Sequence, residues 1–211
     1  MKNMGVKNSI ILDNCHIDET VSLGENVKIF QNVTIIGNCE IGDNVTIYPN
    51  TIIEDCKIDS GTVVKSSYLE KSIIGKDCII GPYAHLRPNC CLKDECHIGN
   101  FVEIKNSTIG KGTKANHLAY VGDADIGENC NIGCGAIFVN YNGKEKNRTK
   151  VGNNCFIGSN CNIVAPVEIA NNSYICAGTT LTVNTKEFDF VIGRSKETIK
   201  SERAKKYLKN F

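Results

Sequence analysis

The 211-residue sequence lacks the long apolar runs, charge imbalance and paired cysteines that mark several protein classes. No apolar stretch approaches 18 residues, so we expect no membrane span. The formal net charge is only +1, so no strong global field directs the chain to nucleic acid or to a membrane surface. The first residues, MKNMGVKNSIIL, are too polar and too short for a signal peptide, which favours the cytoplasm.

The twelve cysteines do not follow the spacing of a disulfide framework or a zinc site. No C-x-x-C pair occurs, and none of the four histidines lies at a finger-like interval from a cysteine pair. We therefore predict reduced, structural cysteines and no bound metal.

Aliphatic residues recur with a period of six, which predicts the fold. A small residue, often Cys or Val, follows four places after each of them, and Gly often follows directly. The aliphatic positions form three runs: 11, 17, 23, 29, 35, 41 and 47; 74, 80, 86, 92, 98 and 104; 151, 157, 163, 169, 175 and 181.

A six-residue unit is too short for a helix and a turn but fits a short strand and a turn. Three units make one triangular coil of roughly 18 residues, the hexapeptide class of parallel β-helix. We therefore predict an all-β, left-handed parallel β-helix, with the cysteines as small apolar residues inside it.

The period changes in three places, around residues 57–72, between Ile104 and Ile109, and between Phe138 and Val151. The last change is an insertion, which we expect to project outward as a functional loop. We place the β-helix at residues 1–194 and a C-terminal tail at 195–211. The spacing of apolar residues in the tail predicts a short helix that caps or braces the solenoid.

Four segments together resemble a known enzyme: HLRP with Arg87, NFVEIK with Lys105, KANHLAYVGDA with His117, and the VNYNG loop. They resemble the C-terminal acetyltransferase domain of the bifunctional glucosamine-1-phosphate N-acetyltransferase / N-acetylglucosamine-1-phosphate uridyltransferase family. The resemblance extends over essentially the whole chain and is densest from Gly81 to Arg194. Nothing in the sequence resembles the Gly-rich nucleotide motif of the uridyltransferase half, so uridyl transfer is not predicted. The sequence does not decide whether this is a free-standing gene product or part of a bifunctional enzyme.

The resemblance implies transfer of an acetyl group from acetyl-CoA to the amine of glucosamine 1-phosphate, a step towards UDP-N-acetylglucosamine and cell-wall precursors. The amine attacks only when neutral, and a histidine with an ordinary pKa near 6.5 suits the base. His117 matches the catalytic histidine of the family, and Glu103 matches the carboxylate that orients it.

The phosphate of such a substrate requires cations, and Arg87 and Lys105 match the phosphate-binding residues of the family. They are 18 residues apart, so we expect them to stack one coil apart at the same corner. The resemblance also assigns the sugar pocket to Tyr120, Asn131, Asn140 and Tyr141.

The thioester carbonyl gains negative charge during attack, and fixed donors lower that barrier. The resemblance places Ser159 and the backbone near Cys134 close to the carbonyl of acetyl-CoA. It places Ala177 against the pantetheine and Arg194 near the CoA phosphates. Lys146 resembles a residue that reaches towards the cofactor or a neighbouring subunit.

Three positions depart from the usual family pattern. Asn142 stands where aspartate is common, and Cys134 and Ala136 replace the usual Ala and Thr. None of these changes removes a proposed catalytic group, but they leave the efficiency of the enzyme open.

The resemblance implies a homotrimer with active sites between subunits. A hydratase of the γ-carbonic-anhydrase type requires two histidines five residues apart, but the partner position of His117 is Gly122. A non-catalytic solenoid scaffold would not need Arg87, Lys105 and His117 in this order. Galactosamine 1-phosphate or another amino sugar phosphate remains an alternative acceptor.

Overall fold

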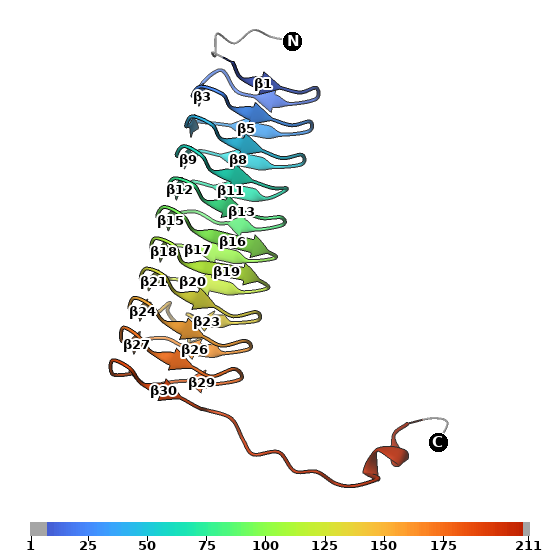
Figure 1. Ribbon diagram of the computed structural model, residues 1–211, viewed down its shortest axis with the longest axis vertical. Helices are drawn as coiled ribbons and strands as arrows, with labels where there is room; N and C mark the ends of the chain where they lie inside the picture. The colour runs from blue at the N-terminus through green and yellow to red at the C-terminus, as the bar shows by residue number, and fades with distance from the viewer. Residues whose placement is uncertain (1–7, 209–211) are drawn as a thin grey trace.

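The six-residue repeats fold into strands of two to four residues that wind around a triangular column (Figure 1). The computed structural model describes residues 8–208, so the predicted boundaries at residues 1 and 211 lie outside the described residues. Successive strands fall in three different parallel sheets, and each strand pairs with strands one coil away. The predicted all-β, left-handed parallel β-helix is confirmed.

Each sheet runs along one face of the column, and all the strands named here lie within residues 8–208. Sheet A contains β1 (Ile10–Ile11), β4 (Lys28–Ile29), β7 (Thr46–Ile47), β10 (Val63–Val64), β13 (Ile79–Ile80), β16 (His97–Asn100), β19 (Lys114–His117), β22 (Asn131–Ile132), β25 (Phe156–Ile157), β28 (Tyr174–Ile175) and β30 (Phe190–Val191). Sheet B contains β2 (His16–Ile17), β5 (Thr34–Ile36), β8 (Ile52–Glu54), β11 (Tyr68–Glu70), β14 (His85–Leu86), β17 (Glu103–Lys105), β20 (Tyr120–Gly122), β23 (Ile137–Val139), β26 (Asn162–Val164) and β29 (Thr180–Leu181). Sheet C contains β3 (Ser22–Leu23), β6 (Glu40–Ile41), β9 (Lys57–Ile58), β12 (Ile73–Ile74), β15 (Cys91–Leu92), β18 (Thr108–Ile109), β21 (Ala124–Ile126), β24 (Thr149–Val151) and β27 (Glu168–Ile169).

The aliphatic residues of the repeat point into the column and stack on one another. In sheet B, Leu86 pairs with Ile104 and Ile104 with Val121, and all three side chains are fully buried. Where the period shortens, a turn loses residues but the stacking continues: Val63 pairs with Ile79, sixteen residues further along the chain. This continuous ladder holds the outward-facing residues of adjacent coils at fixed spacing.

The small residues at the corners do more than fill space. Thr62 Oγ1 accepts a hydrogen bond from the backbone N–H of Cys78 at 3.0 Å, and Cys130 Sγ accepts one from the N–H of Cys155 at 3.4 Å. Cysteine thus occupies the same corner positions as serine and threonine. All twelve thiols are free and nine are buried. Burial raises the pKa of Cys56 to about 12, which keeps that thiol protonated.

Many turns place one residue in the left-handed backbone region, where asparagine is among the best tolerated residues after glycine. Three bulky residues break this rule at the corner between sheets A and B, hereafter the A–B corner. Tyr83, Phe101 and Leu118 have φ values of 59°, 56° and 49° and are 60%, 58% and 58% exposed. The rings of Tyr83 and Phe101 stack 5.3 Å apart. We call these three residues the A–B ridge.

The C-terminal tail leaves the last coil and extends away from the column (Figure 1). Its regular element is a 3-10 helix, η1 (Arg203–Lys206), with no buried residue. Residues 209–211, and with them Phe211, lie outside the described residues. Between residues 8 and 208, no helix has the length and apolar character needed to cross a membrane.

Candidate functional site

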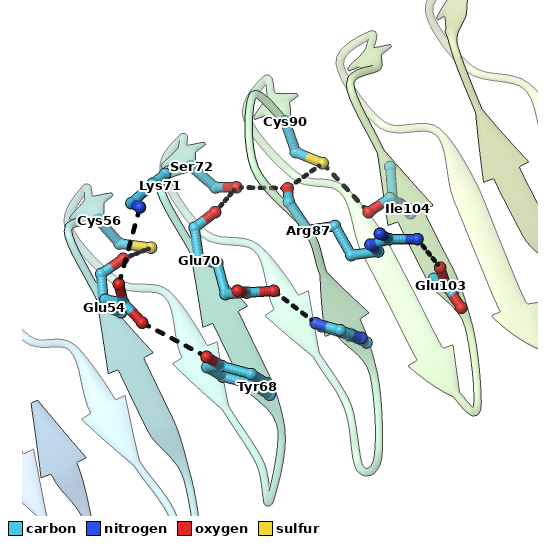
Figure 2. A network of polar contacts seen from close by, with 11 residues as sticks. Glu54, Cys56, Tyr68, Glu70, Lys71, Ser72, Arg87, Cys90, Glu103 and Ile104 are labelled. Carbon is cyan, nitrogen blue, oxygen red and sulfur yellow. Dashed lines mark hydrogen bonds and ion pairs between the residues drawn. The ribbon is translucent and has the colours of Figure 1, made fainter. Parts of the chain in front are cut away.

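The two predicted phosphate-binding residues lie side by side on sheet B. Lys105 ends β17, and Arg87 follows β14 in the preceding coil. Because Leu86 pairs with Ile104, the register places Arg87 beside Lys105. Arg87 Nη1 donates a hydrogen bond to Glu103 Oε1 at 3.0 Å (Figure 2). This bond raises the pKa of Arg87.

Lys146 joins this pair from the inserted loop of the same chain. Its proximity lowers the pKa of Lys105, and burial and the charge of Arg87 add to the effect. The Lys105 side chain is only 17% exposed. Arg87, Lys105 and Lys146 thus form a cation cluster, and their mutual repulsion would be relieved by a bound anion.

A buried carboxylate that sequence reasoning missed lies under this cluster. Asp123 Oδ1 accepts a hydrogen bond from Asn106 Nδ2 at 2.5 Å, and Oδ2 accepts one from Asn140 Nδ2. Lys105 Nζ lies 3.8 Å from Oδ2. The aspartate stands in the KANHLAYVGDA motif, and its left-handed φ of 50° marks it as a turn residue of the corner between sheets B and C.

Two residues predicted for the sugar pocket meet above Gly122. Asn140 Nδ2 lies 3.4 Å from the hydroxyl of Tyr120. A Cβ atom at position 122 would lie 2.5 Å from that hydroxyl and 2.8 Å from Asn140 Nδ2. Glycine at this position therefore allows both polar side chains to lie across the strand, beside the cation cluster.

The inserted loop between β23 and β24 is exposed and folds on itself. Tyr141 forms a β-bridge with Lys146, and its hydroxyl donates to the carbonyl of Gly143 at 2.8 Å. Asn142 Oδ1 accepts the N–H groups of Lys144 and Glu145, both at 2.9 Å. A carboxylate oxygen could accept the same bonds, so asparagine at position 142 preserves this turn.

The loop is fastened to the column at its end. Arg148 binds the carboxylate of Asp125 through two nitrogens and donates from Nη1 to the carbonyl of Asn106 at 2.9 Å. Thr149 N–H donates to the carbonyl of Asp123 at 3.1 Å. These bonds hold the end of the loop against the corner that also binds its start through Asn140 and Asp123.

His117 lies at the A–B corner, at the end of β19, and is exposed. It lines a groove of about 310 Å³ together with His97, Asn100 and Asn116. Glu103, predicted to orient His117, instead contacts Arg87, and the hydrogen bonds found among residues 8–208 include none between Glu103 and His117. The role of Glu103 stays a prediction.

Three predicted cofactor residues extend a column that begins at His117. The register pairs Ala115 with Ile132, Ile132 with Ile157, and Ile157 with Ile175. Two residues after each of these comes an exposed side chain at the A–B corner. This corner column contains, in order, His117, Cys134, Ser159 and Ala177.

The two remaining predicted residues lie near the corner column. Asn131 belongs to β22 and is half-buried on sheet A. The Arg194 side chain packs against Gly178, which directly follows Ala177. Ala136, the other departure from the family pattern, is fully buried.

No group of three or more His, Cys, Asp or Glu side chains suited to hold a metal ion occurs in the described part of the chain. A larger hollow of about 500 Å³ lies on sheet C beside Asp125, Lys150 and Glu168, and it contains none of the predicted site residues.

Comparison with known proteins shows which families and proteins the chain is similar to. Residues 11–93 match the GMPPB C-terminal domain family, and residues 148–182 match the bacterial transferase hexapeptide family (six repeats). The bifunctional protein GlmU of Clostridium novyi is 57% identical to this chain over 113 residues, which are 53% of this chain and 25% of that protein. About half of this chain is therefore similar to GlmU proteins.

Other GlmU proteins match equally well. That of Limosilactobacillus fermentum is 52% identical over 54% of this chain and 25% of its own length, and that of Caldicellulosiruptor saccharolyticus 55% over 53% and 24%. The chain thus spans about a quarter of the length of these GlmU relatives. The family resemblance predicted from the sequence motifs is confirmed, but these relatives match about half of the chain and not, as predicted, essentially all of it.

Among solved structures, the UDP-N-acetylglucosamine acyltransferase of Francisella novicida is 14% identical, with a TM-score of 0.43 over 84% of this chain and 63% of that one.

Proposed function

We propose that this chain is an N-acetyltransferase that transfers the acetyl group of acetyl-CoA to the amine of glucosamine 1-phosphate. The observation that carries the proposal is the cation cluster on sheet B, with the neutral donors of Tyr120 and Asn140 beside it. A sugar phosphate presents both a dianion and hydroxyl groups, and this surface offers partners for both.

Arg87, Lys105 and Lys146 bind the phosphate in the proposed complex, and Tyr120 and Asn140 bind the sugar. His117 removes a proton from the substrate ammonium group, and the neutral amine attacks the thioester carbonyl. The attacking nitrogen then loses a second proton, the carbon–sulfur bond breaks, and the departing CoA thiolate takes up a proton, so that CoA leaves as the thiol and N-acetylglucosamine 1-phosphate is the product. Ser159 and backbone N–H groups near Cys134 stabilise the oxyanion.

We further propose that the active enzyme is a homotrimer. The cation cluster lies on sheet B, whereas the corner column lies along the A–B corner and is exposed. Arg87 and Lys146 remain accessible at the surface of the cluster, and a threefold assembly of prisms would place the sheet B surface of one subunit against the corner column of the next.

Thiol release from acetyl-CoA tests the reaction, with glucosamine, galactosamine and their 1-phosphates as acceptors. We expect the fastest release with glucosamine 1-phosphate and little release without the phosphate. Faster release with galactosamine 1-phosphate would change the acceptor but keep the chemistry. No release with any acceptor would refute the acetyltransferase.

Mixed oligomers test the assembly. Co-expressed His117→Ala and Lys146→Ala subunits should recover part of the activity, because some interfaces pair an intact His117 with an intact Lys146. A monomer by light scattering that still catalyses the reaction would contradict the trimer. Recovery would be absent if both residues serve the same site from one chain.

A further inference from the structure

Asp123 connects two parts of the proposed acceptor site that lie far apart in the sequence. One carboxylate oxygen faces Asn106 and the other faces Asn140, with Lys105 Nζ 3.8 Å away. The residue is only 6% exposed. Both oxygens are therefore engaged with protein groups, and solvent has little access to them.

The backbone of Asp123 makes two further contacts. Its N–H donates to the carbonyl of Lys105 at 2.9 Å, and its carbonyl accepts the N–H of Thr149 at 3.1 Å. The side-chain bond from Asn140 holds the start of the inserted loop, and the bond from Thr149 holds its end. Asp123 thus contacts the phosphate-binding strand and both ends of the loop that carries Lys146.

The direction of these hydrogen bonds fixes the chemistry that Asn140 can offer. Because its Nδ2 faces Asp123 and the Tyr120 hydroxyl, its Oδ1 remains as an acceptor for a sugar hydroxyl. The charge of Asp123 also offsets part of the repulsion among the three cations while no phosphate is bound.

We propose that Asp123 is the positioning residue of the acceptor site, and that it makes the site select phosphorylated amino sugars by holding Lys105 and Asn140 in place. This inference rests on the proposed acetyltransferase function. Burial alone would raise the pKa of Asp123. The hydrogen bonds from Asn106 and Asn140 and the charges of Lys105 and Lys146 outweigh burial and lower this pKa, so the carboxylate is charged at neutral pH.

The test compares Asp123→Asn with Asp125→Asn. Asp125 is the matched control because its carboxylate also fastens the loop, through Arg148, but it does not contact Lys105 or Asn140. Asparagine at position 123 has one acceptor oxygen and one NH2 group in place of the two carboxylate oxygens. One of the two donors, Asn106 Nδ2 or Asn140 Nδ2, would therefore face another donor.

We expect Asp123→Asn to raise KM for glucosamine 1-phosphate by at least about tenfold, and KM for acetyl-CoA by less than about twofold. Asp125→Asn should leave both values within about threefold of the parent chain. Equal effects of the two variants, or parallel rises in both KM values for Asp123→Asn, would overturn the inference and leave the acetyltransferase in place.

Backbone amide hydrogen exchange, measured without substrate, tests the same inference independently of enzyme activity. The Asn147 N–H donates to the carbonyl of Asn140 at 2.7 Å. Asp123→Asn should speed exchange at the N–H groups of Asn147 and Thr149 by about tenfold, and by more than Asp125→Asn does at Asn147. Unchanged exchange at both amides would overturn the inference even if the parent chain proved inactive, whereas absence of thiol release from the parent chain would refute only the proposed function.

Discussion

Replacing Arg87 with alanine separates its contribution to folding from its contribution to phosphate binding. In the free chain, its guanidinium contacts Glu103 at 3.0 Å, and the two side chains are 42% and 38% exposed. Exposed ion pairs of this kind stabilise proteins by less than about 1 kcal/mol. The fold should therefore tolerate the change, with a small decrease in the melting temperature.

The expected effect on binding is larger. A hydrogen bond to a charged group contributes about 1.5–3 kcal/mol, which corresponds to a factor of about ten to one hundred in an equilibrium constant. The substitution also frees the Glu103 carboxylate, whose charge would repel a phosphate. Both effects act in the same direction, so KM for glucosamine 1-phosphate should rise at least about tenfold.

Steady-state kinetics with varied acceptor and varied acetyl-CoA measures this effect. Lys71→Ala is the matched control, because Lys71, which directly follows β11 of the same sheet, forms an ion pair with Glu54 at 3.8 Å, with the two side chains 55% and 30% exposed. That variant should leave KM unchanged. If Arg87→Ala weakens unphosphorylated glucosamine as much as the 1-phosphate, or raises KM for acetyl-CoA equally, the phosphate role of Arg87 is refuted.

Three further predictions concern the base, the ridge and the cation cluster. His117→Ala should lower kcat by about two or more powers of ten with little change in acceptor KM; near-normal turnover at saturating substrate would exclude His117 as the base. Leu118→Asn should raise the free energy of unfolding of the isolated chain by about 1 kcal/mol, because Leu118 is 58% exposed and asparagine tolerates the left-handed backbone better than leucine does; an unchanged or lower denaturant midpoint would contradict the strain argument. The pKa of Lys105 is lower in the folded chain than in the unfolded chain. At alkaline pH between these two pKa values the unfolded chain binds more protons, so the free energy of unfolding should rise with pH there. Phosphate bound at the cation cluster should raise the pKa of Lys105. Titration calorimetry of phosphate binding, carried out in alkaline buffers of different ionisation enthalpy, should then detect proton uptake by the protein. Proton release on binding would contradict the proposal that these cations bind the phosphate.

The sequence predicts those parts of the molecule that follow the repeat. A six-residue period determines which side chains point inward, and a spacing of one coil determines which outward side chains are neighbours. Arg87 and Lys105 lie side by side for this reason, and so do the members of the corner column.

The parts outside the period could not be predicted in the same way. Lys146 belongs to a loop that folds back on the column through Arg148 and Asn140, and no periodic signal encodes that return. In the sequence, Asp123 is not distinguished from the other polar turn residues. Its role depends on its hydrogen bonds with Asn106 and Asn140, which come from two other coils. The tail has apolar residues at helical spacing, but up to residue 208 none of them is buried, and the regular element in this part of the tail is a four-residue 3-10 helix.

Because the strands stack in register, two quantities define the position of each site residue: its height along the column and which of the three faces it lies on. Neighbouring strands lie about 4.8 Å apart, so a whole added coil between Lys105 and His117 would move His117 by one such step and keep its direction. An insertion of six residues would instead turn His117 and everything after it by one third of a revolution, onto the next face. A β-helix can therefore change the distance between its catalytic groups in uniform steps, or transfer a group to another face, while every inward-facing residue still meets an inward-facing neighbour.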